Sequence, residues 1–366
     1  MPAETGAGGA RVVTENPYFG RGRRCFVVAE IGANHGGDIE LCLRTMVAAA
    51  ESGVDALKLQ YYTAAELVAD VDRVWAWGPE GGRVEERIGD MFDRLALTKA
   101  ELQRAFAHAE RLGIPLFCTP FSVRGVADLE ELGNPIYKIA SSDLSHYPML
   151  DAIDRLRKPT IISTGKSPLE DVDAAVAAMR RTPDEHVALL HCIAEYPAPC
   201  EQMNVRVIAG FQERFPGHPI GLSDHCTTDE PALAAVALGA CVLEKHFTLD
   251  RQLSGPDHWF SMDPEQMRRL VESLRRLEQS LGDGKKGIAA CEQWEVAYSR
   301  RSIIAVKYIA PGEVVSEEHL ALLRPGSGLH PRNWSAVIGR RARVAIDARE
   351  PLRWEMLEGD PPSDAR

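Results

Sequence analysis

Several features that would assign this chain to other classes of protein are missing from its sequence. The longest uncharged apolar run, residues 231–243, falls well short of the about 20 residues that a membrane-spanning helix needs. Residues 1–20 contain Glu4 and Glu15 and lack a continuous apolar core, so we expect no secretory signal there. We therefore expect a cytoplasmic protein without a membrane segment.

The chain also lacks closely spaced cysteine pairs and an excess of positive charge. The eight cysteines include no CxxC pair, which argues against a zinc ribbon or a dithiol redox motif and favours reduced, structural thiols. The formal net charge of −11 disfavours broad binding to nucleic acid or to an anionic membrane. Any anionic substrate must then be held by a few placed lysines and arginines.

What the chain does contain is a regular alternation of short apolar runs and helical patterns. Such runs, bounded by turn or cap residues, are typical of strands buried on both faces of a parallel sheet. They occupy residues 26–31, 56–60, 115–119, 136–140, 159–164, 187–192, 219–223 and 241–247. Eight strand–helix units predict an α/β fold, a closed (β/α)₈ TIM barrel. The alternative, a doubly wound open sheet, would normally carry GxGxxG after its first strand, and residues 32–37 do not match that motif.

The pattern changes near residue 290. Short β-like runs at residues 302–306 and 342–346, with turns at Pro311-Gly312 and Pro325-Gly326, predict a small β-rich domain. We accordingly divide the chain into a flexible N-terminus (1–24), the barrel (25–283), a linker (284–297), the small domain (298–358) and a tail (359–366).

Polar side chains gather where the barrel strands are predicted to end, which is where barrel enzymes place their active sites. Lys58 and Lys138 lie inside apolar runs, and a lysine is almost never buried without a partner. One interpretation is purely structural pairing with Glu30 or Glu244. The hydroxyl and glycine residues at the same strand ends favour an anionic substrate instead.

Two histidines follow neighbouring strands. His225 and His246 could converge on one divalent ion, although spacing alone leaves a hydrogen-bonded structural role equally open. A third group such as Glu30 or water would then complete the ligand set of a catalytic metal site, which is open to substrate, rather than a closed structural one.

In this order along the chain, the motifs resemble the sialic acid synthase (N-acetylneuraminate synthase) family. The matching segments include Glu30-Ile31-Gly32-Ala33-Asn34-His35, Lys58-Leu59-Gln60, Tyr137-Lys138-Ile139-Ala140-Ser141, Ser163-Thr164-Gly165, Ser223-Asp224-His225 and Glu244-Lys245-His246. Residues 324–329 resemble the antifreeze-like (SAF) domain that these synthases carry. The resemblance runs from about residue 25 to 357.

The resemblance implies a transferase that condenses phosphoenolpyruvate with an N-acylated amino sugar aldehyde, giving a sialic-acid-type 2-keto-3-deoxy nonulosonate and phosphate. It implies three groups of site residues. The phosphoenolpyruvate site would comprise Lys58, Thr119, Lys138, Ser141, Ser163, Tyr196 and Ser223. The sugar would be held by Gln60, Asp257 and Arg324. Glu30 would be the catalytic carboxylate, with His225 and His246 holding catalytic Mn²⁺ or another divalent ion such as Mg²⁺ or Co²⁺.

The family also implies a domain-swapped homodimer in which the small domain of one subunit covers the barrel of the other, so that Arg324 would act in trans. Two positions depart from the family pattern. Ala194 stands where many members have Asn, and Lys166 where Met is common. We hypothesise that Lys166 and Glu195 form an ion pair at the mouth, with an unrelated pair of solvated charges as the alternative.

Other functions remain compatible with these residues. The chain could be a metal-assisted aldolase that uses pyruvate, or a synthase of the same chemistry acting on a different or 6-phosphorylated sugar. A non-catalytic sugar-binding scaffold is a third possibility, but it would not need Glu30, both lysines and both histidines together.

Overall fold

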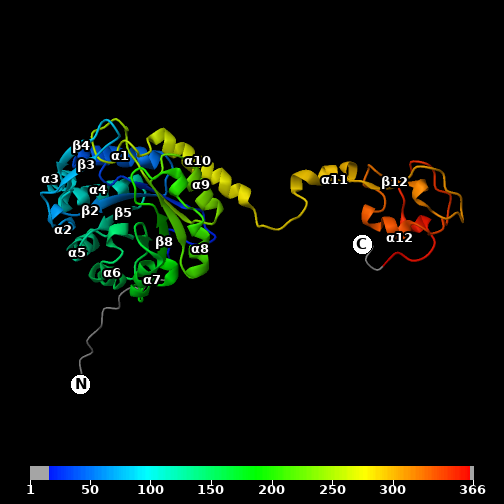
Figure 1. Ribbon diagram of the computed structural model, residues 1–366, viewed down its shortest axis with the longest axis horizontal. Helices are drawn as coiled ribbons and strands as arrows, with labels where there is room; N and C mark the ends of the chain where they lie inside the picture. The colour runs from blue at the N-terminus through cyan, green and yellow to red at the C-terminus, as the bar shows by residue number, and fades with distance from the viewer. Residues whose placement is uncertain (1–15, 363–366) are drawn as a thin grey trace, which may run out of the picture. The chain divides into compact units, whose positions relative to one another are not determined.

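The computed structural model describes residues 16–362, in two units that divide after Gly282, next to the predicted end of the barrel at residue 283 (Figure 1). Among the residues described, no helix is both long and apolar enough to cross a membrane.

The first unit is a closed barrel of parallel strands, as predicted. The strands are β1 (Phe26–Glu30), β2 (Ala56–Tyr61), β5 (Leu116–Pro120), β6 (Tyr137–Ile139), β7 (Thr160–Ser163), β8 (Val187–Cys192), β9 (Ile220–Asp224) and β10 (Val242–His246). Their order is β1-β10-β9-β8-β7-β6-β5-β2, and the sheet closes because β1 pairs with both β10 and β2.

Helices surround this sheet (Figure 1). They are α1 (Ile39–Glu51), α4 (Lys99–Leu112), α5 (Val123–Glu131), α6 (Tyr147–Asp154), α7 (Leu169–Ala178), α8 (Val207–Arg214), α9 (Glu230–Ala237) and α10 (Pro264–Leu281). Local sequence defines their ends: α4 begins at a capping box of Thr98 and Glu101 and ends at Gly113, whose φ of 69° is left-handed.

Alternation along each strand separates two buried layers. Val27 and Ala29 of β1 pack with the helices in one cluster, whereas Phe26 and Val28 lie in a second cluster with Phe117, Ile161 and Val242 from other strands. Because successive side chains point to opposite faces, this second cluster fills the barrel interior. The residues two positions further along these strands point to the same side, at the carboxyl end.

The stretch between β2 and α4 holds elements that the sequence interpretation missed. They are α2 (Ala64–Leu67), an antiparallel hairpin of β3 (Val74–Trp77) and β4 (Val84–Arg87), and α3 (Ile88–Leu95). Gly81-Gly82 lies between two short runs that each begin with valine, residues 74–77 and 84–87, and was an available hairpin signal.

The N-terminal segment is less free than predicted. Phe19 is buried in the interior cluster beside Phe26, and the Arg21 guanidinium donates to the carbonyl oxygens of His218 and Phe215. A flexible segment over residues 1–24 is therefore wrong for residues 16–24, because apolar burial and these hydrogen bonds hold them. Residues 1–15 lie outside the described part of the chain.

The C-terminal unit has its own core. β11 (Ser302–Ala305) pairs antiparallel with β12 (Leu320–Leu323), and Ile303, Leu320 and Leu352 are buried with their neighbours. Residues 342–346 form isolated bridges, Ala342 with Leu357 and Ile346 with Ile309, rather than the expected strand. This unit also contains the short helix α12 (Trp334–Val337).

Part of the predicted linker is helical and belongs to this C-terminal unit. It contains η4 (Ala290–Glu292) and α11 (Gln293–Ser299), and the Gly326 N–H donates to the Ala297 carbonyl at 2.9 Å. Short 3₁₀ turns elsewhere are η1 (Ser141–Asp143), η2 (Asp184–His186), η3 (Cys200–Gln202), η5 (Glu317–His319), η6 (Pro331–Asn333) and η7 (Trp354–Met356).

Candidate active site

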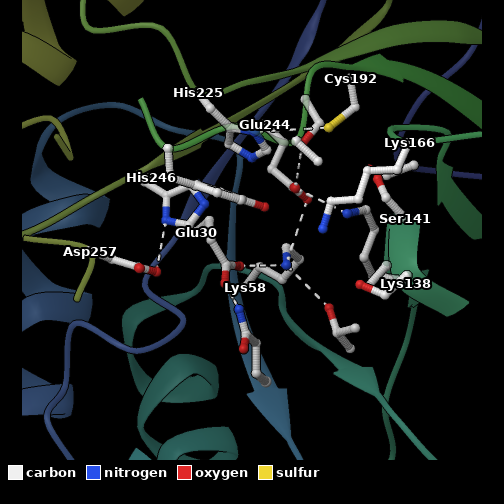
Figure 2. Close-up of a pocket in the computed structure, with 18 of the residues that line it drawn as sticks. Glu30, Lys58, Lys138, Ser141, Lys166, Cys192, His225, Glu244, His246 and Asp257 are labelled. Atoms are coloured by element: carbon white, nitrogen blue, oxygen red, sulfur yellow. Dashed lines mark hydrogen bonds and ion pairs between the residues drawn. The ribbon is translucent and has the colours of Figure 1, made fainter. Parts of the chain in front are cut away.

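The inward positions at the carboxyl end of the barrel are polar on every strand except β8, which has Cys192 there. They are Glu30, Lys58, Thr119, Lys138, Ser163, Cys192, Ser223 and Glu244, each two residues after an interior position such as Val28 or Val242. All of them line one cavity, together with Gln60, Ser141, Tyr196, His225, His246 and Asp257 from the strand ends and loops (Figure 2). The barrel thus brings together every predicted site residue except Arg324.

Two lysines and two carboxylates form a buried network in this cavity. Lys58 Nζ lies 2.5 Å from Glu30 Oε2 and 3.7 Å from Glu244 Oε2, and Lys138 Nζ lies 3.0 Å from Glu244 Oε1. All four side chains are at most 5% exposed. The structural pairing considered for these lysines therefore exists, and it leaves the four formal charges balanced.

The network shifts the ionisation of its members. Burial works against the charged form of Glu244, but Lys138 and Lys58 outweigh it and lower the pKa of Glu244 to about 2. Burial also disfavours charged Lys58, yet the carboxylates of Glu244 and Glu30 raise its pKa. Burial lowers the pKa of Lys138, whose nearest carboxylate is shared with Lys58.

Hydroxyl groups surround the network. Lys58 Nζ donates to Thr119 Oγ1 at 3.1 Å, and Ser223 Oγ donates to Glu244 Oε1 at 3.0 Å. Ser141 Oγ accepts from the Gly165 N–H at 2.9 Å. Ser163 Oγ is buried and has no hydrogen-bond partner among the residues described, so it remains available to a ligand.

The two predicted metal histidines face each other. Their ring centroids are 5.2 Å apart, and the Tyr196 ring packs against His225 with centroids 4.2 Å apart. His225 Nδ1 lies 2.8 Å from the Ile193 carbonyl oxygen, which leaves Nε2 free to bind a metal. Burial, with His246 nearby, lowers the pKa of His225 to about 3, so the imidazole is the neutral form that metals bind.

These imidazoles fit a divalent ion, but only as an incomplete ligand set. Within residues 16–362 no group of three or more His, Cys, Asp or Glu side chains is arranged to hold a metal. The remaining positions would fall to substrate or water, as in an open catalytic site.

The predicted sugar-binding residues are divided between the two units. Gln60 Nε2 donates to Glu30 Oε1 at 2.7 Å, and Asp257 Oδ2 lies 3.4 Å from His246 Nδ1, so both lie at the cavity. Arg324 belongs to the C-terminal unit, where it is exposed directly after β12.

Sequence reasoning missed part of the lining and was wrong about one pair. Cys192 and Phe121 also line the cavity, although an apolar run gives no signal for that. Lys166 and Glu195 are both exposed and line a neighbouring cavity, but no ion pair joins them among the contacts described, which agrees with the alternative of two unrelated charges. Instead, Lys166 points into the main cavity beside Ser141 (Figure 2), because it follows Gly165 at the end of β7.

Fold and site together define a barrel of the enzyme class whose active-site cavity lies at the carboxyl ends of the strands. The NeuB family model matches residues 45–286, and the SAF domain model matches residues 300–358. The chain belongs to the NeuB family, and its relatives include proteins named as legionaminic acid, pseudaminic acid and N-acetylneuraminate-9-phosphate synthases.

Relatives and a solved structure agree with this assignment. The chain is 34% identical over 322 residues to the N,N'-diacetyllegionaminic acid synthase of Campylobacter jejuni, covering 87% of this chain and 96% of that protein. It is 30% identical over 348 residues to the human N-acetylneuraminate-9-phosphate synthase, covering 93% and 95%. The N-acetylneuraminic acid synthetase of Leptospira borgpetersenii superposes with a TM-score of 0.68 at 30% identity, covering 77% of this chain and 97% of that one.

The balanced network generates a stability prediction. Lys138→Met or Glu244→Gln alone leaves one buried charge without its partner and should cost about 3–5 kcal/mol of unfolding free energy. The double variant keeps the Lys58–Glu30 pair and removes one charge of each sign. It should therefore be less destabilised than either single variant, as measured by urea unfolding. If the loss of unfolding free energy in the double variant equals the sum of the losses in the two single variants, the two residues do not belong to one network.

Proposed function

We propose that this protein condenses phosphoenolpyruvate with an N-acylated amino sugar aldehyde resembling N-acetylmannosamine, to give a 2-keto-3-deoxy nonulosonate and phosphate. The observation that carries the proposal is the cavity in which two buried lysines, the Glu30 carboxylate and two imidazoles converge with the hydroxyl groups of Thr119, Ser141, Ser163, Tyr196 and Ser223. An anionic enol phosphate and a carbonyl substrate need that combination of groups.

Different residues of the cavity would bind phosphoenolpyruvate, the amino sugar and the metal ion. Lys58 and Lys138, with Thr119, Ser141, Ser163, Tyr196 and Ser223, bind phosphoenolpyruvate. Gln60 and Asp257 hold the amino sugar beside it, since Gln60 contacts Glu30 and Asp257 lies next to His246. A divalent ion on His225 and His246, Mn²⁺ or a relative, would supply Lewis acidity toward the aldehyde oxygen.

Glu30 is placed to handle the proton of the water molecule. The methylene carbon of phosphoenolpyruvate forms a bond to the aldehyde carbon, whose oxygen becomes an alkoxide. The carbon that carries the phosphate is left electron-poor, and water adds there while the Glu30 carboxylate accepts its proton and passes it to the alkoxide. The C–O bond to phosphate then breaks, the remaining proton of the added hydroxyl leaves with the phosphate, and the ketone forms. Gly32 lets Glu30 occupy this place, because a Cβ at Gly32 would lie 2.2 Å from Glu30 Oε1.

The reaction is tested by product analysis. The pure protein with phosphoenolpyruvate, Mn²⁺ and a panel of N-acylamino aldoses, free and 6-phosphorylated, should release one phosphate per nonulosonate formed. Mass spectrometry identifies the product, and Glu30→Gln serves as the inactive control. Product formation from free pyruvate, with no phosphate released, would instead support the aldolase alternative.

Metal dependence is the second prediction. EDTA treatment should abolish turnover and Mn²⁺ should restore it, because the two imidazoles supply only part of a coordination sphere. Mn²⁺ binding, followed by electron paramagnetic resonance, should be lost in the His225→Ala, His246→Ala double variant. His108→Ala on α4 is the matched control and should bind Mn²⁺ normally. Full activity in excess EDTA rules out the metal.

Arg324 supplies the third prediction, for a homodimer whose active sites combine two subunits. Arg324→Ala subunits mixed with Glu30→Gln subunits should recover activity, since the heterodimer contains one site with an intact barrel and an intact Arg324. Random mixing would restore about one quarter of wild-type sites. Refolding or co-expression makes the heterodimers, and each variant alone is the control. Heterodimers without activity count against the swap.

A further inference from the structure

Apart from Lys166, the lysines that line the cavity are all paired with carboxylates. Lys58 and Lys138 are neutralised by Glu30 and Glu244, and Asp257 adds a negative charge at the mouth. A ligand with a phosphate and a carboxylate brings further negative charge, since a phosphate monoester alone carries about −1.5 to −2 at neutral pH. A further cationic side chain would therefore favour binding of such a ligand, in addition to a divalent ion held by His225 and His246.

Lys166 is the remaining cationic residue among those that line the cavity. Across residues 16–362 it makes no ion pair, and no hydrogen bond of its ammonium group is present, so its charge is not already used. Lys166 is exposed to solvent, and its side chain extends toward Lys138 and Ser141 at the edge of the cavity (Figure 2). Lys245, one strand position from Glu244, behaves differently: its ammonium lies 2.7 Å from Asp224 and is consumed by a structural pair.

The backbone holds Lys166 at this point. Its φ of 61° lies in the left-handed region, which is uncommon for a lysine and is retained when surrounding contacts enforce it. Those contacts involve Gly165, whose N–H donates to Ser141 Oγ at 2.9 Å. A Cβ at Gly165 would lie 3.0 Å from both Ala194 Cβ and Ser141 Oγ, so the turn packs tightly against β8.

Lys166 also lines a neighbouring cavity, which is a poorer place for an anion. That second cavity contains Glu80, Glu195 and Asp257 against the two cations Arg83 and Lys166, and it is walled by tryptophans. The main cavity instead offers hydroxyl donors close to Lys166, including the unpartnered Ser163 Oγ three residues earlier in the chain.

We infer that Lys166 is a third cation of the anion site and binds the phosphate group of phosphoenolpyruvate, alongside Lys58 and Lys138, which keep their pairs with the buried carboxylates. This inference rests on the proposed function. It makes Lys166 a determinant of substrate affinity that this chain supplies from the end of β7.

The test compares Lys166→Met with wild type. Its dissociation constant for phosphoenolpyruvate, measured by calorimetry with Mn²⁺ present, should rise about ten-fold, the scale of one charge-assisted hydrogen bond. Lys166→Arg keeps the charge and should stay within about two-fold. Lys158→Met changes the net charge equally from the opposite end of β7 and should leave the constant unaltered.

Inhibition by inorganic phosphate and by pyruvate shows which part of phosphoenolpyruvate Lys166 contacts. Inorganic phosphate should inhibit Lys166→Met about ten-fold more weakly than wild type, whereas inhibition by pyruvate, which lacks the phosphate, should not change. Equal loss for phosphate and pyruvate, or a change in the sugar KM alone, would overturn the inference. So would unchanged phosphoenolpyruvate affinity in Lys166→Met. If wild type itself does not bind phosphoenolpyruvate, the proposed function fails as well.

Discussion

The active end of this barrel depends on four buried charges that balance one another. Isolated ions of either sign cost several kcal/mol each in a protein interior, so neither lysine could lie on its strand without the carboxylates opposite. Glu244 is the shared member, because both Lys58 and Lys138 contact it. The cavity is therefore held in shape by electrostatics where the rest of the interior is held by apolar packing.

Strand periodicity connects the two halves of the interior. The same inward-facing rows that supply Val28, Ile136 and Val242 to the apolar cluster supply Glu30, Lys138 and Glu244 two residues later. Each barrel strand thus contributes apolar core residues at its amino end and cavity-lining residues at its carboxyl end. The packing of the surrounding helices does not depend on which residues line the cavity. The conformation of the turn after β7 follows from the same arrangement, since Gly165 must fit between the side chains of Ser141, which follows β6, and Cys192 of β8.

Much of this was predictable from sequence, for definite reasons. Apolar runs and helix caps located the barrel, and polar residues such as Lys58 and Glu244 at run ends located the cavity. Tertiary contacts decided the rest. Neighbouring loops suggested an ion pair of Lys166 with Glu195, but the left-handed turn directs Lys166 inward instead. Phe19 looked like part of a loose terminus because its partners in the interior lie far along the chain. Which amino sugar binds is not encoded in the motifs, since relatives at similar identity carry different substrate names.

The most direct measurement is a crystal structure of the protein with bound phosphoenolpyruvate and Mn²⁺. The account predicts the ligand among Lys58, Lys138 and Ser163, its phosphate within hydrogen-bond distance of the Lys166 ammonium, and the ion on His225 and His246. Phosphoenolpyruvate found outside this cavity, with the Lys58–Glu30 and Lys138–Glu244 pairs untouched by any ligand, would contradict it.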